Sequence, residues 1–205
     1  MKRPKLNQRG FTIAELMIAT LVFSVVLLLV TTGIIQIGRT YYKGINEANT
    51  QDTARTIMET VGQAVQFSGG TVGQTDPTEQ AGVLKAFCVG NTQFSYRLGT
   101  QLVTASPGTG QSTSVLRENT VNNCNAASPP MSTGQELLSP KMRLSELVVM
   151  PVPGGVAFTI RVKVVYGDSD LLNNPTTSAA ACKGSNGSQF CSDADISTTV
   201  YKRVN

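Results

Sequence analysis

Near the N-terminus, 23 consecutive residues from Leu16 to Gly38 carry no charged side chain. As an α-helix this apolar run would be roughly 35 Å long, whereas the hydrocarbon core of a bilayer is about 30 Å thick. The run therefore predicts a chain that is inserted in a membrane. The residues that follow must then fold outside the lipid, on one side of the membrane.

Basic residues gather before the apolar run, and no acidic residue occurs among the first ten positions. This asymmetry predicts that the N-terminus lies in the cytoplasm and that the residues after Arg39 lie outside. The other 13 basic residues are balanced by 13 acidic ones, so the net charge of +4 comes from the leader. Bulk charge therefore gives no strong nucleic-acid signal. The basic leader residues are Lys2, Arg3, Lys5 and Arg9.

A secretory signal peptide and a plain signal-anchor helix are the two alternatives for this segment. The apolar region of a signal peptide usually ends after about 7–15 residues at a small-residue cleavage site. This run is longer, and no good Ala-x-Ala site stands near its end. A plain anchor fits the length but does not explain Glu15, because a carboxylate in hydrocarbon costs roughly 2.5–3.5 kcal/mol. An acid in such a position predicts a function for Glu15.

Residues 9–16 read RGFTIAEL behind the basic leader, and this pattern resembles the processing site of type IV prepilins and type II secretion pseudopilins. The resemblance implies that a prepilin peptidase in the membrane cuts after Gly10 and methylates Phe11. It also implies that Glu15 compensates the new N-terminal amine when subunits assemble. Many pilins have a proline midway along this helix, which this chain lacks. Thr31-Thr32-Gly33 is the expected place for local unwinding instead, since hydroxyls compete for carbonyls and glycine is a weak helix former.

The resemblance implies a non-enzymatic structural subunit, namely a minor pilin or pseudopilin (similar to the J- or W-like type) of a type IV pilus-like or type II secretion filament. Its implied partners are the prepilin peptidase, other pilin or pseudopilin subunits, the inner-membrane assembly platform and the membrane. Before assembly it would be a single-pass cytoplasmic membrane protein, and afterwards part of an extracytoplasmic or cell-surface filament. The alternative is a membrane-anchored extracytoplasmic binding module that does not polymerise. The sequence has no histidine, which excludes Ser-His-Asp and Cys-His nucleophiles.

Beyond Gly38 the helical period continues with apolar and charged faces, and Ser68-Gly69-Gly70 predicts its end. From Thr71 onward the period changes to two, most clearly over Val156–Tyr166. We therefore expect an α+β fold in which a long N-terminal helix packs on an antiparallel sheet. The expected segments are a leader at 1–10, a transmembrane or filament-core helix at 11–38, an amphipathic continuation at 39–67 and a globular domain at 68–205. The other strand candidates are 83–89, 93–98, 114–121, 142–150 and 198–204. The apolar face of the helix is expected to include Ile34, Ile37, Tyr41, Ile45, Ala48, Ala54, Ile57, Val61 and Ala64.

Four cysteines, Cys88, Cys124, Cys182 and Cys191, all lie on the expected outer side, where disulfides are favoured. Three pairings can be formed, and we favour Cys182 with Cys191, which closes a small loop, and Cys88 with Cys124. Reduced, buried cysteines are the alternative, and the spacing does not fit zinc. No cofactor is expected. Calcium in the acidic loops remains an alternative to plain polar turns, although no full ligand spacing is present. The acidic loop residues are Asp168, Asp170, Asp193 and Asp195.

Overall fold

The computed structural model describes residues 10–76, 80–103, 113–127, 132–154, 156–177, 179–184 and 187–203, so the basic residues of the leader lie outside the described part. One helix, α1 (Ile13–Phe67), is followed by antiparallel strands, which is the α+β architecture that the sequence predicts. The chain divides into two units after Tyr41. Each unit is described by itself below.

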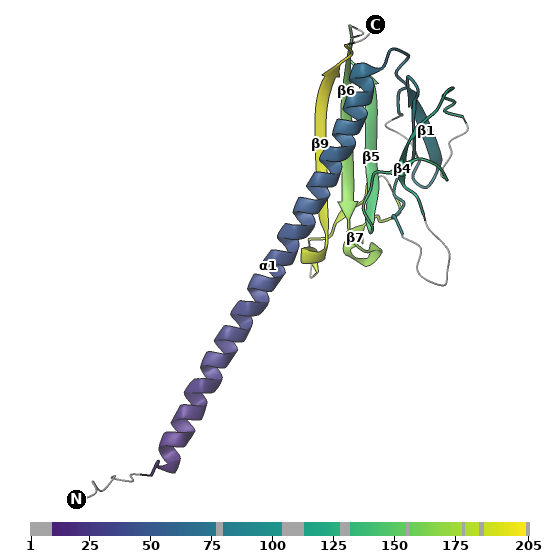
Figure 1. The fold of residues 1–205 in the computed structure, drawn as a ribbon. Coiled ribbons are helices and arrows are strands. Elements are labelled where there is room, and N and C mark those ends of the chain that lie inside the picture. Colours follow the sequence, from purple (N-terminus) through teal and green to yellow (C-terminus); the bar gives the residue numbers. More distant parts are fainter. Residues whose placement is uncertain are drawn as a thin grey trace, which may run out of the picture. The chain divides into compact units, whose positions relative to one another are not determined.

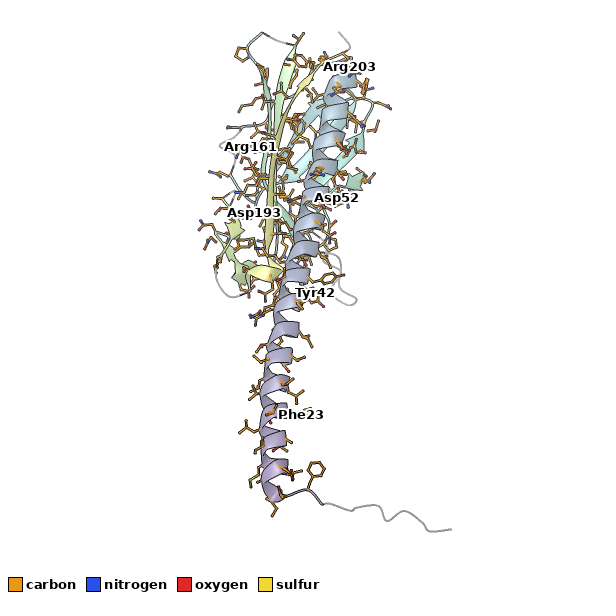
Figure 2. All side chains as sticks on the ribbon, turned by 90° about the vertical axis from the view of Figure 1, so that its left-hand side faces the viewer. Phe23, Tyr42, Asp52, Arg161, Asp193 and Arg203 are labelled. Carbon is orange, nitrogen blue, oxygen red and sulfur yellow. A yellow bond between two sulfur atoms is a disulfide. The ribbon has the colours of Figure 1, made fainter. Side chains whose placement is uncertain are left out.

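In the first unit, α1 runs through the whole apolar segment, and none of its residues there is buried. Figure 2 shows apolar side chains, with Phe23 labelled among them, projecting from all sides of this part of the helix. A helix that is apolar all round normally lies in lipid or among other helices. By length and composition α1 is the candidate membrane span of the described residues.

In the second unit, the C-terminal part of α1 packs on the strands through one stripe of buried residues (Figure 1). The steps of three and four between these residues are those of a single helix face. The sequence correctly predicted burial at Ala54, Ile57 and Val61, but it was wrong for Ile45 and Ala48, which are exposed. Burial begins only at Thr50. The buried residues of α1 are Thr50, Ala54, Ile57, Met58, Val61, Gly62 and Val65.

The helix lies on a three-stranded antiparallel sheet in which β6 is the central strand. Alternate residues of β6 turn inward, among them Ile160, Val162 and Val164, all fully buried. They join Ile57 and Val61 of α1 in the main hydrophobic core. This is the alternation that the sequence predicts for Val156–Tyr166. The strands are β5 (Met142–Pro151), β6 (Ala157–Tyr166) and β9 (Ser192–Tyr201).

The last strand was predicted at 198–204 and this was wrong at its start, because β9 begins at Ser192; Val204 lies outside the described residues. Its first half contains Asp193 and Asp195, and aspartate is disfavoured in strands. The structure offsets this cost for Asp195, whose carboxylate accepts two hydrogen bonds from Arg161 of β6, at 3.0 and 2.6 Å. Arg161 thereby lowers the pKa of Asp195.

A second antiparallel sheet has the order β1-β2-β3-β4 and adds aromatic side chains to the same core. Phe87 of β1 stacks on Phe94 of β2 with ring centroids 5.0 Å apart. The three longer strands fall within the predicted ranges to within two residues at either end. The strands are β1 (Leu84–Val89), β2 (Thr92–Arg97), β3 (Leu116–Thr120) and β4 (Gln135–Glu136).

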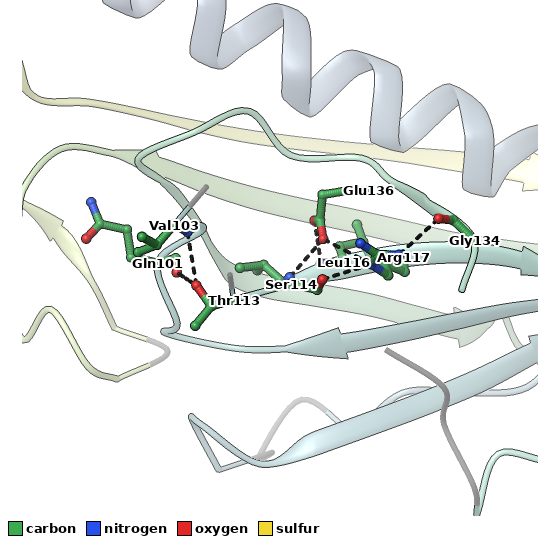
Figure 3. Close-up of polar contacts among 9 residues, drawn as sticks. Gln101, Val103, Thr113, Ser114, Leu116, Arg117, Gly134 and Glu136 are labelled. Atoms are coloured by element: carbon green, nitrogen blue, oxygen red, sulfur yellow. Dashed lines mark hydrogen bonds and ion pairs between the residues drawn. The ribbon is translucent and has the colours of Figure 1, made fainter. Parts of the chain in front are cut away.

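Glu136 fastens the short edge strand β4 to β3 (Figure 3). Its carboxylate accepts hydrogen bonds from the backbone N–H groups of Val115, at 3.0 Å, and Leu116, at 2.8 Å. Arg117 lies 3.8 Å from the same carboxylate and donates to the hydroxyl of Ser114 at 2.8 Å. Side-chain acceptors therefore satisfy backbone donors at the end of the sheet, where strand pairing is short.

Arg143 on β5 is a buried cation that organises the loop after β6. Its guanidinium donates to the carbonyl oxygens of Pro175, at 2.6 Å, and Gly167, at 3.2 Å. Burial lowers the pKa of Arg143. The same loop carries two short elements, β7 (Leu172–Asn173) and β8 (Ala181–Cys182), which pair with each other.

Candidate processing and assembly site

Thr12 and Glu15 form a closed hydrogen-bonded unit at the start of α1. The Glu15 carboxylate accepts hydrogen bonds from the backbone N–H of Thr12, at 2.9 Å, and from the Thr12 hydroxyl, at 3.0 Å. In return, the backbone N–H of Glu15 donates to the Thr12 hydroxyl at 3.2 Å. This reciprocal arrangement is a capping box, with Thr12 as the N-cap of a helix that begins at Ile13.

The capping role of Thr12 was missed in the sequence, although its signal was present. Threonine followed three positions later by glutamate, just before an apolar run, is the usual pattern of a helix start. The first N–H groups of a helix have no partner within it, and the box pairs two backbone donors at this end, those of Thr12 and Glu15. Glu15 is thus held at the first turn of α1, where a negative charge is also favoured by the helix dipole.

Gly10 and Phe11 precede the helix, and both are exposed to solvent. Phe11 is 87% exposed. A Cβ atom built on Gly10 would meet no other described atom within 4 Å, and its backbone is not in the left-handed region that favours glycine. Neither packing nor backbone conformation within the described residues requires a glycine at this position.

Beyond this first turn, hydroxyl groups along the apolar run find partners on the helix itself. Thr20 and Ser24 donate to the carbonyls of Met17 and Thr20, at 3.0 and 2.8 Å. Thr31 donates to Leu27 at 2.7 Å, and Thr32 donates to Leu28 and Leu29 at 3.0 and 2.9 Å. These groups can therefore enter lipid without an unpaired donor. The segment Thr31-Thr32-Gly33 is helical here, and its unwinding stays a prediction.

Both cysteine pairs lie in the second unit and are joined as favoured from the sequence. Cys88 on β1 bonds to Cys124, 36 positions further along the chain, and Cys182 on β8 bonds to Cys191, nine positions further. The Cα atoms of the two pairs are 5.9 and 5.8 Å apart. The second disulfide ties the start of β9 to the loop that Arg143 organises.

The acidic residues expected in loops are not gathered at one point, and the expectation was wrong for Asp193 and Asp195, which lie on β9. Asp168 pairs with Lys141 at 3.2 Å, and Asp195 pairs with Arg161. The Lys141 pKa is raised by this hydrogen bond and by the charge of Asp168. Among the described residues, no three histidine, cysteine, aspartate or glutamate side chains come close enough together to hold a metal ion.

One comparison with known proteins gives a match. The family model described as the prokaryotic N-terminal methylation motif matches residues 5–31, which include Gly10, Phe11 and Glu15. No curated protein and no solved structure matches this chain.

Proposed function

We propose that this chain, which carries the prokaryotic N-terminal methylation motif of type IV prepilin-like proteins, is a minor pilin or pseudopilin. A motif of this family implies processing by a prepilin peptidase and assembly as a pilin in general. The finer proposal is a non-enzymatic structural subunit of a type IV pilus-like or type II secretion filament. It is cut after Gly10, methylated at Phe11 and assembled through the first turn of α1.

The surroundings of Gly10 support cleavage at this position. Among the described residues, none lies close enough to Gly10 to require a glycine at this position. A peptidase that binds residues 10 and 11 in an extended form needs close access to the backbone, and a missing side chain provides it. The neighbouring Phe11 is exposed and open to approach.

The position of Glu15 carries the assembly step, and it is the observation on which the proposal mainly rests. The capping box holds its carboxylate one turn from Phe11, at the helix end that cleavage turns into the N-terminus of the chain. A new ammonium group in a low-dielectric setting is stabilised by a nearby carboxylate. In a bundle of apolar helices, the carboxylate of one subunit can provide this charge for the amine of another.

The exposed apolar surface of α1 in the first unit supports polymerisation after the membrane stage. None of its residues is buried, and most of its large apolar side chains are half exposed or more. Leaving lipid for water would expose all of them, which costs roughly 25 cal/mol per Å² of apolar surface. Packing against the same segment of other subunits avoids this cost. A helix bundle is therefore the expected destination of the segment.

The mature N-terminus tests the processing step. We would purify the protein from its own membranes without reductant and measure its intact mass and N-terminal sequence. The expected product begins at N-methylated Phe11 and lacks four hydrogens for its two disulfides. A chain that keeps residues 1–10 in cells with an active prepilin peptidase would contradict the proposal.

A pair of variants separates the charge of Glu15 from its capping role. Glu15→Gln removes the charge, whereas Thr12→Val removes both hydroxyl hydrogen bonds of the box and leaves the carboxylate in place. Filament incorporation, measured in sheared surface fractions, should be lost in Glu15→Gln and largely kept in Thr12→Val. Cleavage after Gly10 should continue in both. Equal loss in the two variants would mean that Glu15 acts only as a helix cap.

A further inference from the structure

An aromatic patch lies at one end of the second unit, where η2 (Ser188–Phe190) meets α1. We define the patch as Tyr42, Ile45 and Phe190, which are 57%, 39% and 48% exposed. The rings of Tyr42 and Phe190 contact each other with centroids 6.3 Å apart. Ile45 lies three positions after Tyr42, on the same face of the helix. Single exposed apolar residues are common on proteins, but these three lie together.

Polar contacts with the next turns of α1 hold Phe190 in this place. Asn46 donates from its side-chain amide to the carbonyl of Gln189 at 3.0 Å. The hydroxyl of Ser192 donates to the carbonyl of Asn46 at 3.0 Å and also bonds to the hydroxyl of Thr50. Cys191, which directly follows Phe190, is held by its disulfide bond to Cys182. Phe190 is thus an exposed aromatic residue whose neighbours in the sequence are held in place by hydrogen bonds and a disulfide.

The place of Tyr42 in the sequence relates the patch to the membrane. Tyr42 follows Gly38, the end of the uncharged run, by four residues, or about 6 Å of helix rise. With residues 16–38 in a bilayer, Tyr42 lies at the outer lipid–water interface. Phe190 is brought to this level by its ring contact with Tyr42, although 148 positions separate the two residues in the sequence. Aromatic rings with a polar edge prefer this layer of the membrane.

The charges beside the patch indicate which lipid surface it fits. A cavity of about 270 Å³ between this part of α1 and the disulfide is lined by Lys43, Glu47, Lys183 and Asp193, together with small polar residues. Two cations and two anions therefore line the same small space. A purely anionic surface would repel half of them, whereas a zwitterionic headgroup carries a partner for each sign.

We propose that the aromatic patch docks on the headgroup layer of zwitterionic phospholipid, with the Phe190 ring among the upper acyl chains. This contact would orient the second unit on the outer face of the cytoplasmic membrane before the subunit is assembled. The inference rests on the membrane stage of the proposed function. It assigns to η2, next to the Cys182–Cys191 disulfide, a lipid-binding role in addition to its role in the fold.

The absence of tryptophan from the sequence allows a direct test. Phe190→Trp places the single tryptophan in the patch, and Tyr201→Trp is the matched control, because Tyr201 is 66% exposed at the other end of β9. Phe23→Trp reports on the apolar run. Each full-length variant is reconstituted in phosphatidylethanolamine–phosphatidylcholine vesicles, with and without brominated acyl chains. Tryptophan emission and its quenching are then measured.

We expect a blue-shifted, quenched emission for Phe190→Trp and Phe23→Trp, and neither effect for Tyr201→Trp. Replacing Cys182 and Cys191 by serine in the Phe190→Trp background should reduce the quenching. A Phe190→Trp emission like that of Tyr201→Trp, with Phe23→Trp quenched, would overturn the docking inference and leave the proposed function standing. An unquenched Phe23→Trp would overturn both, since the run would then not lie in the bilayer.

Discussion

The two parts of α1 are one continuous helix, yet they depend on different surroundings. Up to Tyr41 the helix has no buried residue, and apolar side chains cover every side. From Thr50 to Val65 it has one buried stripe and otherwise polar faces. The second part is stabilised by the strands of its own chain. The first part requires a solvent or a partner that the described residues of the chain do not supply.

This difference determines how strictly each part of α1 constrains the size and shape of its side chains. In the second part, Ile57 and Val61 must fit particular neighbours, so their shape and volume matter. In the first part, many apolar side chains would serve equally well in lipid, which contacts them without a fixed shape. Thr12 and Glu15 at the helix start are exceptions, because their side chains form a specific hydrogen bond with each other. Truncating one apolar side chain should therefore lower the stability much more in the second part than in the first.

The largest expected effect comes from removing disulfides, which affect only the second unit. In the chain-entropy model, replacing Cys88 and Cys124 by serine lowers the unfolding free energy by about 4 kcal/mol, because that loop is long. The same change at Cys182 and Cys191 costs about 3 kcal/mol, because that loop is short. Urea unfolding of the full chain in micelles, followed by near-ultraviolet circular dichroism, measures both values.

The apolar helix is the internal control for these disulfide variants. Its amide protons should stay protected in micelles when the second unit unfolds, since no cysteine lies in the first unit. Adding reductant to the wild type should reproduce the summed loss. A larger loss for the short loop than for the long one would contradict the entropic explanation.

Core truncation should distinguish the two parts of the helix at the level of one side chain. Ile57 is fully buried against β-strand residues, so Ile57→Ala should lower the unfolding free energy of the second unit by about 3 kcal/mol. Ile35 is 50% exposed in the first unit, and Ile35→Ala should change that value by less than about 0.5 kcal/mol. Both are measured by the same urea titration. Similar losses would mean that the two parts are not independent.

The sequence predicted the main elements because local patterns determine them. The apolar run, the helix period and the alternation in β6 all depend on near neighbours along the chain. The predicted start of β9 was wrong because aspartate normally disfavours a strand, and Asp195 is stabilised in β9 by its hydrogen bonds with Arg161 of β6. This contact is known only once β6 and β9 are paired. The burial of Arg143 likewise depends on carbonyl groups of a loop more than 20 residues away.

The residues of the candidate sites also differ in whether a local sequence pattern could reveal them. Gly10, Phe11 and Glu15 stand in one short motif and could be recognised directly. Thr12 could have been added from its spacing to Glu15. The contact of Phe190 with Tyr42 could not, since it joins residues from opposite ends of the sequence. Such contacts result from the packing of β9 beside the helix and have no local signal.

A smaller effect is expected at the start of the helix, where the chain supplies its own polar partners. Thr12→Ala removes the cap and should destabilise the first turn by about 1 kcal/mol. Amide exchange at Leu16, whose N–H donates to the Thr12 carbonyl at 3.2 Å, should become roughly five times faster in micelles. Thr40→Ala is the control, because the Thr40 hydroxyl bonds to Gln36 within the helix. Faster exchange at Leu16 in that control would rule out a local capping effect.

The smallest effect concerns the ion pair that compensates for the acidic first half of β9. Hydrogen bonds from Arg161 lower the pKa of Asp195 below its ordinary value of 3.8, so the pair stabilises the fold above that pH. The contribution is lost as the pH falls through the lowered pKa, when the folded protein takes up the proton. Because the carboxylate is 38% exposed, solvent screening limits the loss in Asp195→Asn at pH 7 to less than about 1 kcal/mol. The difference from wild type should shrink in urea titrations as the pH falls below this lowered pKa. Asp52→Asn, which removes an exposed acid on α1 without an ion pair among the described residues, is the control and should lower the unfolding free energy at pH 7 by less than Asp195→Asn. A loss at Asp195 that persists at low pH would show that the carboxylate acts through packing and not through its charge.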